Sequence, residues 1–430
     1  MNPVIVIPSY WAESDRPVGV GEADVYDHVT PVNKPVPELE TCLSSLDKVR
    51  GVLRVIVLLV APPAWEKSAR ARVEGICRMH TGLNPLIVGS REARVIARAV
   101  DRLAPTVPDG AITLRGYGAI RNMGLAVAAT LGHDVVVFLD DDEVALSDTF
   151  LIDAVYGLGL KNRQGLSIIA KTGYFLDRDD SPYADVKDPA WEDALWSKRH
   201  EFNEFMEAKL SGTRISRSNY ICGGCFAVSA EAFTRVAFDP VITRGEDLDY
   251  LFNLRMNGID VWFDSQWYVR HMPPEIEDSA SRFQQDVYRW LYEVKKLELS
   301  NQTIGLRRVT ADSLVPYPGP WVSPEVERRI RQTAFRRALV GPEHGTYLRM
   351  LLKGIPEARA WAEASSARYQ AFQTFWQGII ETLWDTKALA NMILATGEVE
   401  ALGKMRLPEI ESEDRLAGLE EPPSSTGGVS

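Results

Sequence analysis

Short unbroken apolar runs alternate with stretches of helical spacing along the first part of the chain. The runs at 4–7, 52–61 and 85–88 predict buried strands, and an amphipathic helix is expected after each of them. Pro8 is expected to end the first strand because proline cannot donate a hydrogen bond to a central ladder. The strand-helix-strand order predicts an α/β fold, in which a mostly parallel, Rossmann-like sheet carries helices on both faces.

A long connection separates the first strand from the first helix. Residues 10–37 are rich in Gly, Pro and Asp. Loops of this length inside compact domains are usually functional, so we expect this one to form the wall of a pocket, with disorder as the alternative. Pro37 opens the helix that follows.

The most informative stretch is the apolar run 134–139, which predicts a short, fully buried strand. It ends in three consecutive carboxylates, Asp140, Asp141 and Asp142, with Glu143 behind them. Such crowded acids oppose each other's ionisation unless a cation compensates them, which favours a hard divalent ion such as Mg²⁺ or Mn²⁺. The alternative is a solvated turn in which one of the acids caps the next helix.

A glycine-rich turn precedes the helix that leads into this strand. Gly116, Gly118, Arg121 and Asn122 lie at the start of that helix. Backbone N–H groups and an arginine at a helix start can bind phosphate, although the signal is weak by itself. Further on, the segment 171–206 is dense in aromatic and acidic residues and predicts either the wall of an acceptor site or the packing of an insertion.

Two later segments carry glycines and acids. The segment 220–233 predicts a strand with Gly223 and Gly224 in its middle, which indicates a bulge or a close backbone approach to a ligand. Gly245 precedes Glu246 and Asp247 at the start of a predicted helix. These acids are either functional or present because negative charge in the first turn is favoured by the helix dipole.

A strand pair is predicted within 261–274, and His271 follows it. A lone histidine is usually structural, but one placed just after a strand can bind a metal.

The remainder of the chain has a helical pattern. Helices are predicted at 281–298, 324–339 and 357–395, and the last carries an apolar stripe expected to pack on the rest of the chain or on a partner subunit. This gives three predicted regions: an α/β domain at 1–275, an all-helical region at 276–405 and a disordered acidic, Pro/Ser/Gly-rich tail at 406–430.

Composition narrows the choice of partners. The chain has 430 residues, a net charge of −11 and a pI near 5.2, which argue against a general nucleic-acid or anionic-membrane surface. We expect no transmembrane segment and no signal peptide, and therefore a cytoplasmic protein. Cys222 and Cys225 have the spacing of half a zinc site, but reduced thiols are the favoured interpretation because no second such pair completes it.

The order and spacing of these motifs resemble a family 2-type glycosyltransferase of the GT-A fold. The resemblance covers roughly residues 1–275. The motifs are Pro8-Ser9-Tyr10, Gly118 followed by Arg121-Asn122-Met123-Gly124, Asp140-Asp141-Asp142, Gly223-Gly224-Cys225-Phe226, Gly245-Glu246-Asp247 and His271.

The resemblance implies transfer of a sugar from a nucleoside diphosphate sugar to an acceptor hydroxyl. Asp142, with His271, would bind Mn²⁺ or Mg²⁺, and Asp247 would be the general base of an inverting reaction with Glu246 beside it. The implied donor contacts are Pro8, Tyr10, Arg121, Asn122, Asp140, Asp141, Gly223 and Gly224. Where family members usually place an acid after the second strand, this chain has Val60-Ala61-Pro62-Pro63, so UDP and GDP donors both stay open.

Three other functions stay open at this point. A retaining glycosyltransferase of the same fold becomes preferable if Asp247 lies away from the acceptor. A phosphohydrolase would use Asp140 as nucleophile and Asp142 as acid, but that motif is expected on a first strand. A carbohydrate-binding or scaffold protein would not need Asp247. We also expect the C-terminal helices to offer a surface for a second copy of the chain.

Overall fold

The computed structural model describes residues 1–13, 26, 29–103, 110–184, 188–273, 280–340 and 343–399. The predicted tail at 406–430, and the last residues of the predicted helical region, lie outside the described residues. The long connection at 10–37 is described at its two ends and at Tyr26.

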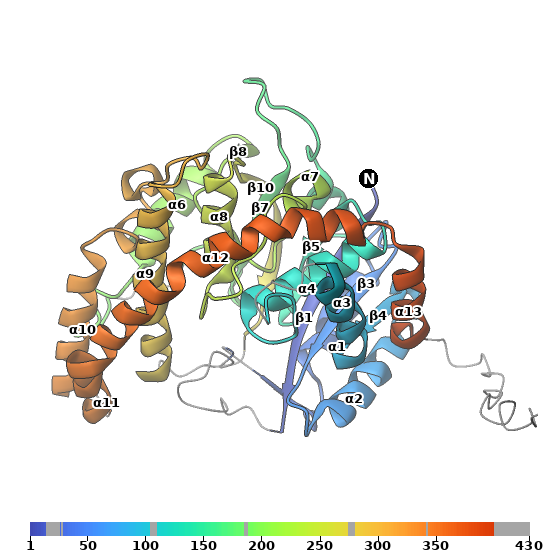
Figure 1. Ribbon diagram of the computed structural model, residues 1–430, viewed down its shortest axis with the longest axis horizontal. Coiled ribbons are helices and arrows are strands. Elements are labelled where there is room, and N and C mark those ends of the chain that lie inside the picture. The colour runs from blue at the N-terminus through green and yellow to red at the C-terminus, as the bar shows by residue number, and fades with distance from the viewer. Residues whose placement is uncertain are drawn as a thin grey trace, which may run out of the picture. The chain divides into compact units, whose positions relative to one another are not determined.

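The core element is a ten-stranded sheet with the strand order β4-β3-β1-β5-β9-β7-β10-β6 (Figure 1). Outside this order, β2 pairs with β1, and β8 pairs with β10. Its strands are β1 (Pro3–Ala12), β2 (Thr30–Pro31), β3 (Val55–Val60), β4 (Pro85–Val88), β5 (Val135–Phe138), β6 (Glu143–Ala145), β7 (Ala170–Leu176), β8 (Ile215–Arg217), β9 (Phe226–Ser229) and β10 (Trp262–His271). The pairs from β4 through β5 are parallel, and so is the pair of β7 with β10. β9 runs antiparallel between β5 and β7, and β6 and β8 pair antiparallel with β10.

Helices cover both faces of this sheet and form the C-terminal region. They are α1 (Glu38–Leu46), α2 (Glu66–Met79), α3 (Ser90–Leu103), α4 (Tyr117–Thr130), α5 (Phe150–Val155), α6 (Arg199–Leu210), α7 (Ala230–Phe233), α8 (Glu246–Met256), α9 (Ala280–Ser300), α10 (Val326–Val340), α11 (His344–Arg349), α12 (Ile355–Leu383) and α13 (Lys387–Gly397), with short helical turns η1 (Thr81–Leu83), η2 (Ala311–Leu314), η3 (Gly319–Trp321) and η4 (Met350–Gly354). Side chains alternate between the faces of a strand. On β1, Val4 and Val6 join the apolar cluster of α3, α4, α8 and α12, while Ile5 and Ile7 join that of α1, α2 and α5.

Two of the C-terminal helices, α12 and α13, pack on the α/β part. α12 contacts both α9 and α4 and crosses the molecule between them, and α13 contacts α3 and β4 (Figure 1). The predicted single helix at 357–395 is wrong in one respect: it is broken between α12 and α13, where Asp385 has a φ of 46°. The predicted fold class, a mostly parallel α/β sheet with helices on both faces and a helical C-terminal region, is confirmed.

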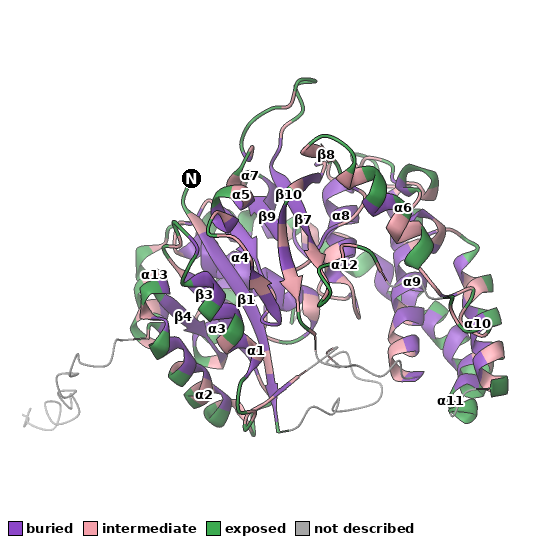
Figure 2. Cartoon of the chain, turned by 180° about the vertical axis from the view of Figure 1, so that it is seen from behind, coloured by how far each residue is buried: buried purple, intermediate pink, exposed green. Residues whose placement is uncertain are grey.

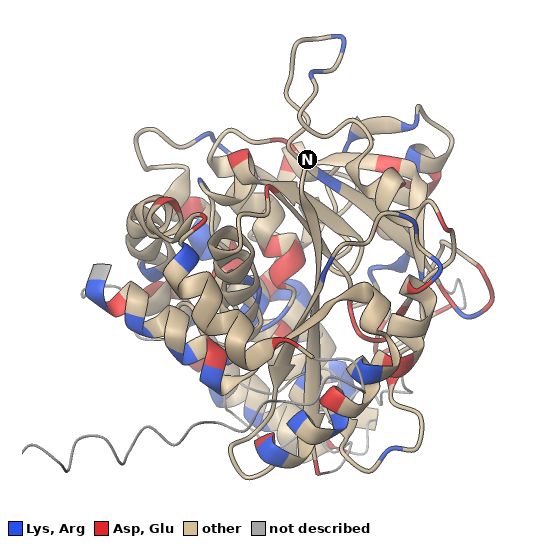
Figure 3. Cartoon of the chain, turned by 90° about the vertical axis from the view of Figure 1, so that its right-hand side faces the viewer, with Lys and Arg blue, Asp and Glu red and all other residues tan. Residues whose placement is uncertain are grey.

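Burial follows this layering. The strands β1, β3 and β5 are buried almost throughout, whereas α10 and α11 expose much of their surface (Figure 2). Lys, Arg, Asp and Glu residues are spread over the helices and loops seen from the side of α13 (Figure 3). Among the described helices, none has the length and apolar character needed to cross a membrane.

The prediction that Pro8 ends the first strand is wrong, since β1 continues to Ala12. The carbonyl of Val6 accepts a hydrogen bond from Leu139, so Val6 faces β5, and Pro8, two residues on, faces the same side. Pairing with β5 ends at Val6 and Phe138. The missing N–H of Pro8 therefore removes no ladder hydrogen bond.

Two other strand predictions are corrected. Gly223 and Gly224 precede β9, which begins at Phe226, so they lie in a turn and not inside a strand. Within the predicted strand pair the structure has one strand, β10 (Trp262–His271), and its register with β7 shifts between Phe263 and Tyr268. All four cysteines are free and buried, in agreement with the favoured interpretation of Cys222 and Cys225.

Candidate functional site

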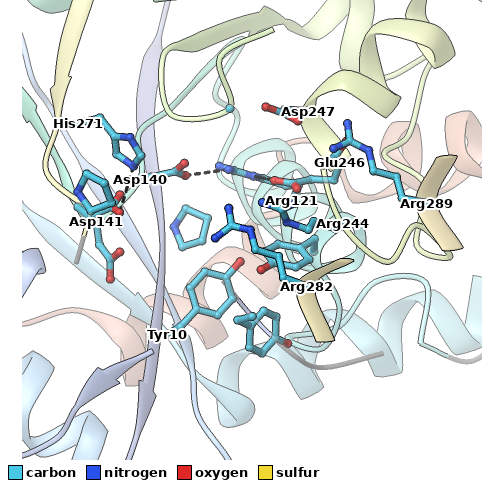
Figure 4. A pocket seen from close by; sticks show the side chains of 17 residues that line it. Tyr10, Arg121, Asp140, Asp141, Arg244, Glu246, Asp247, His271, Arg282 and Arg289 are labelled. Atoms are coloured by element: carbon cyan, nitrogen blue, oxygen red, sulfur yellow. Dashed lines mark hydrogen bonds and ion pairs between the residues drawn. The ribbon is translucent and has the colours of Figure 1, made fainter. Parts of the chain in front are cut away.

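A pocket of about 310 Å³ lies where the carboxyl ends of β1 and β5 face the start of α8 and the N-terminal half of α9 (Figure 4). In open α/β sheets this is the edge at which ligands bind. The lining residues are Pro8, Tyr10, Tyr26, Tyr117, Arg121, Asp140, Asp141, Asp142, Gly223, Arg244, Gly245, Glu246, Asp247, His271, Pro273, Arg282 and Arg289. Ten of the twelve residues proposed from the sequence are among them.

The three aspartates after β5 have different partners. Asp141 is buried and accepts a hydrogen bond from the hydroxyl of Ser9, at 2.6 Å between the oxygens. Asp142 places a carboxylate oxygen 3.2 Å from Nε2 of His271. This contact follows from the antiparallel pairing of β6 with β10, which sets His271 opposite Glu143, the residue after Asp142.

Arg121 connects the strand-end acids to the start of α8. It projects from the first turns of α4, and its guanidinium donates to Asp140 at 2.7 Å and to Glu246 at 3.1 Å. The side chain is 5% exposed, and its third nitrogen, Nη1, has no hydrogen-bond partner. Burial disfavours the charged form, but the carboxylates of Asp140 and Glu246 outweigh it and raise the pKa of Arg121. The cation is therefore permanent and still has a donor to offer to a ligand.

The two acids at the start of α8, Glu246 and Asp247, have raised pKa values. Burial raises the pKa of Glu246 to about 7, although the charge of Arg121 opposes this. Burial also raises the pKa of Asp247, against the charge of Arg289 and a hydrogen bond from the backbone N–H of Leu248. Raised pKa values in a pocket are typical of groups that accept or hold protons near neutral pH.

Glycines let the chain approach closely at two points of this pocket. Gly245 has a φ of +67°, and a Cβ there would lie 2.0 Å from the guanidinium carbon of Arg289. A Cβ on Gly223 would lie 3.2 Å from Nη2 of Arg121 and 3.3 Å from the Cβ of Asp247. Side chains at these positions would fill the space between the arginines and Asp247.

Two residues proposed as donor contacts do not line the pocket. A Cβ on Gly224 would lie 1.8 Å from the Glu143 carboxylate, so this glycine makes room for a buried acid. Burial raises the pKa of Glu143, with the charges of Asp140 and Asp142 adding to it. Asn122 is fully buried, and its amide donates to the carbonyls of Ala111 and Phe238 and accepts from the N–H of Phe238. It ties α4 to the loop before it and to the loop between α7 and α8.

Sequence reasoning missed the basic and aromatic lining. Arg282 and Arg289 come from α9, seven residues apart on one face of a helix, and Arg244 directly precedes the Gly-Glu-Asp turn. The ring of Tyr26 packs at a tilt against that of Tyr10, with ring centroids 4.3 Å apart. The seven-residue spacing of the two arginines was the available signal, but only the folded chain shows which face of α9 meets the pocket.

The donor set at the strand ends fits a divalent metal. Among the described residues no group of three or more His, Cys, Asp or Glu side chains forms a complete metal cage. Asp142 and His271 instead present a carboxylate and an imidazole to the cavity. Two protein donors of these types suit Mn²⁺ or Mg²⁺ when phosphate oxygens and water supply the other ligands.

A second, apolar cavity adjoins the first. It has a volume of about 610 Å³ and shares Tyr10 and Tyr26 with the first pocket. Val60, Ala61, Pro62 and other apolar residues line it beyond the end of β3. A flat aromatic ligand group fits between such walls.

The chain matches no protein-family model and no curated protein. Many solved structures overlap with it, and three of them, all of low identity, are described here. A mannosyltransferase from Pyrobaculum calidifontis, solved with GDP-Man and Mn²⁺, is 15% identical over 87% of this chain and 86% of its own, with a TM-score of 0.42. GalNAc-T7 with UDP, GalNAc and Mn²⁺ is 12% identical over 80% of this chain and 58% of its own (TM-score 0.38).

The third is glucosyl-3-phosphoglycerate synthase from Mycobacterium tuberculosis, with Mn²⁺ and UDP-glucose. It is 16% identical over 66% of this chain and 74% of its own, with a TM-score of 0.33. All three TM-scores lie below 0.5, so the function of this chain is inferred from the residues of its pocket.

Proposed function

We propose that this chain is a metal-dependent glycosyltransferase of the GT-A type, close to the family 2 enzymes, that moves a sugar from a nucleoside diphosphate sugar to an acceptor hydroxyl. One observation carries the proposal. A single pocket contains the Asp142–His271 pair, the Arg121 cation between two acids, and Asp247. These groups supply the three requirements of the reaction: a metal site, a charge for the diphosphate and a base for the acceptor.

The nucleotide is assigned to the wall formed by β1 and α4. Its base fits the apolar cavity beside Tyr10 and Tyr26, and Asp140 and Pro8 lie where its ribose would enter the pocket. The unpartnered Nη1 of Arg121 can donate to a phosphate oxygen, a charge-assisted contact. Asp142 and His271 would hold Mn²⁺ or Mg²⁺, which when bound neutralises charge developing on the leaving diphosphate.

Asp247 is assigned the proton transfer. Its carboxylate accepts the proton of the acceptor hydroxyl while that oxygen forms a bond to the anomeric carbon and the bond from that carbon to the diphosphate breaks. The leaving nucleoside diphosphate takes the bonding electron pair. Burial raises the pKa of Asp247, which improves its strength as a base. Direct attack from the side of Asp247 inverts the anomeric configuration.

The arrangement disfavours the phosphohydrolase alternative. Asp140 would have to be the nucleophile, yet one of its oxygens already accepts a hydrogen bond from Arg121 at 2.7 Å. A retaining transferase of the same fold stays the second candidate, because the pocket also holds Glu246 beside Asp247. Anomeric configuration of the product, read by NMR, separates the two mechanisms.

A thermal-shift panel tests the proposal. UDP-, GDP-, ADP- and TDP-sugars are added with and without Mn²⁺ to the wild type, to Asp142→Ala and to a control, Asp148→Ala, which removes an exposed acid of a surface ion pair. A ligand at a hundredfold excess over Kd stabilises the fold by about 2.7 kcal/mol.

We expect one nucleotide sugar to stabilise the wild type and the control only with metal, and not to stabilise Asp142→Ala. If no nucleotide sugar shifts the wild type with any metal, the donor site is wrongly assigned. The cytoplasmic location, the three-region division of the chain and the pairing of two copies through the C-terminal helices stay predictions.

A further inference from the structure

The second cavity, to which the nucleobase is assigned, contains few groups that could distinguish one base from another. Much of its wall is apolar, with Val60, Ala61 and Pro62 beyond the end of β3. Apolar walls accept any flat ring and supply no base-specific hydrogen bond. Among the described residues that line the cavity, Glu66 carries the one carboxylate. The choice of base therefore depends strongly on what this carboxylate can accept.

Glu66 is the first residue of α2, where an acid is usually explained by the helix dipole. Its contact indicates another role. The start of α2 has no side-chain cap hydrogen bond, and Oε1 of Glu66 instead accepts the backbone N–H of Ser90, at 3.0 Å, just beyond the end of β4. The carboxylate therefore lies at the carboxyl ends of β3 and β4, the edge at which ligands bind in open α/β sheets.

The charge of Glu66 is not used in an ion pair. Among the described residues no Lys, Arg or His forms an ion pair with it, and Arg70, one turn further along α2, pairs with Glu74 and Glu92 instead. The second oxygen, Oε2, accepts no hydrogen bond from the part of the chain that the structure describes. Because Glu66 is only partly buried and lines the cavity, this oxygen is available to a ligand.

A hydrogen-bond donor lies beside this acceptor. Arg94 also lines the cavity, and its Nη1 donates to the hydroxyl oxygen of Ser90 at 3.2 Å. Ser90 thus contacts a carboxylate through its backbone N–H and a guanidinium through its hydroxyl. The lining therefore presents a charged acceptor and a charged donor close to one residue, and both form stronger hydrogen bonds than neutral groups.

The nucleobases differ in the order of the donors and acceptors along their edges. Guanine has two adjacent donors, N1–H and the N2 amino group, beside the acceptor O6. A carboxylate can accept both donors with its two oxygens. Uracil and thymine have one donor, N3–H, between two carbonyls, so a carboxylate that accepts N3–H also faces a carbonyl oxygen. Adenine has one amino donor beside one acceptor. Guanine therefore makes the most hydrogen bonds with this pair of side chains.

We propose that Glu66 selects guanine and that the sugar donor is therefore a GDP-sugar. This inference rests on the proposed function and narrows it to one base. Glu66 accepts N1–H and the N2 amino group of guanine, and Arg94 donates to O6. The segment Val60-Ala61-Pro62-Pro63 contains no acid that could bind a base, and the start of α2 supplies one at the same end of β3.

Isothermal titration calorimetry with GDP, UDP, ADP and TDP, in the presence of Mn²⁺, tests the proposal. These diphosphates carry no sugar, so the sugar has no part in their affinities. One variant is Glu66→Gln, which keeps the size of the side chain and replaces one acceptor oxygen by an amide donor. The matched control is Glu74→Gln, the same change about two turns further along α2 and outside the lining of the cavity. Thermal unfolding checks that both variants are folded.

We expect the wild type and Glu74→Gln to bind GDP at least about tenfold more tightly than the other three diphosphates, the discrimination typical of a bidentate contact to a base. In Glu66→Gln the preference for GDP over UDP should fall to about threefold or less, because the amide turns a donor toward one of the two donors of guanine. The same amide can accept N3–H of uracil and donate to its carbonyl, so UDP should bind this variant no more weakly than it binds the wild type. General damage to the fold would instead weaken all four diphosphates.

Two outcomes would overturn the proposal: a wild type that binds UDP, ADP or TDP as tightly as GDP, or a Glu66→Gln variant that keeps the full preference for GDP. Both leave the proposed function in place if a nucleotide sugar still gives the metal-dependent thermal shift. If GDP binds with the expected preference but no GDP-sugar supports sugar transfer, the proposed function fails and the guanine site stands. If none of the diphosphates binds, both are wrong.

Discussion

Two buried ion clusters of similar composition each include an acid from the first turn of α8. The pocket cluster consists of Arg121 between Asp140 and Glu246. The brace cluster consists of Lys296 between Asp239 and Asp249, and it joins α9 to α8 and to the loop before it. Each places one cation between two carboxylates, and only one of them lines a cavity described above.

The three charged groups of the brace cluster are paired with one another, although Oδ1 of the adjacent Asn253 has no hydrogen-bond partner. The side chains of Lys296, Asp239 and Asp249 are all fully buried, and the hydroxyl of Tyr292 and the amide of Asn253 supply further hydrogen bonds to the two acids. The pocket cluster is incomplete, because Nη1 of Arg121 has no hydrogen-bond partner and the side chain of Asp140 is 37% exposed. A buried charge that is fully paired holds elements together, whereas one with an unused donor beside a cavity is available to a ligand.

The largest expected effect concerns activity. Replacing the proposed base by Asp247→Asn should reduce the rate of sugar transfer by about 10² to 10⁴, the usual contribution of general base catalysis. The rate of nucleoside diphosphate release measures it, and thermal unfolding should stay near that of the wild type. An active Asp247→Asn variant would favour the retaining mechanism.

The next effect concerns stability. Lys296→Met removes the only cation between Asp239 and Asp249 in the brace cluster, and we expect a loss of about 3–5 kcal/mol in the free energy of unfolding, measured by denaturant titration. The neighbouring Lys295 pairs with Glu298 at the surface and gives the matched control, Lys295→Met, for which less than about 1 kcal/mol is expected. Equal losses in the two variants would contradict the assignment of a brace.

The third effect depends on pH. Burial raises the pKa of Glu246 from 4.5 to about 7, so the folded state binds its proton more tightly than the unfolded state. The contribution of Glu246 is fully present below pH 4.5 and is lost as pH rises through about 7, by up to about 3 kcal/mol. Arg121, Asp247 and Asp140 are the charges that act on it.

The side chain introduced by Glu246→Gln cannot ionise, so this variant should not lose stability in this way as pH rises. Its free energy of unfolding, relative to that of the wild type, should therefore rise by up to about 3 kcal/mol between pH 4.5 and pH 8. Denaturant titrations of both proteins at four pH values measure the difference. A difference that does not change with pH would show that Glu246 titrates normally in the folded chain.

The smallest effect belongs to an exposed ion pair. Arg50 contacts Asp148 at 2.9 Å, and both side chains are about 60% exposed. Arg50→Ala should change the free energy of unfolding by less than about 1 kcal/mol, and added salt should reduce even that difference. A larger loss would mean that pairing alone, without burial, explains the stability of the brace cluster.

The local sequence pattern predicted strands and helices well where the spacing of apolar residues matched only one kind of element. The apolar run at 134–139 became β5, and the predicted helices 281–298 and 324–339 became α9 and α10. Errors occurred where neighbouring strands decided the outcome. Pro8 continues β1 because β5 has already ended on the side that it faces, and no feature of the first ten residues carries that information.

The same division applies to the site. The acids after β5, the Gly-Glu-Asp turn and His271 follow elements whose order is written in the sequence, so their assembly at one sheet edge could be predicted. Asn122 and Gly224 belong to the same motifs but do not line the pocket. Asn122 hydrogen-bonds the backbone of a neighbouring loop, and Gly224 makes room for the buried carboxylate of Glu143. Motif membership does not show which way a side chain points.

By itself, the sequence determined the α/β class, the position of the acidic strand end and the residue types available for chemistry, because these depend on local period and on neighbours in the chain. Only the tertiary structure decided that α9 brings Arg282 and Arg289 to the start of α8, and that Lys198 and Arg244 share the carboxylate of Asp286. These contacts join segments more than 30 residues apart. Their geometry depends on how the helices pack, which a one-dimensional pattern does not encode.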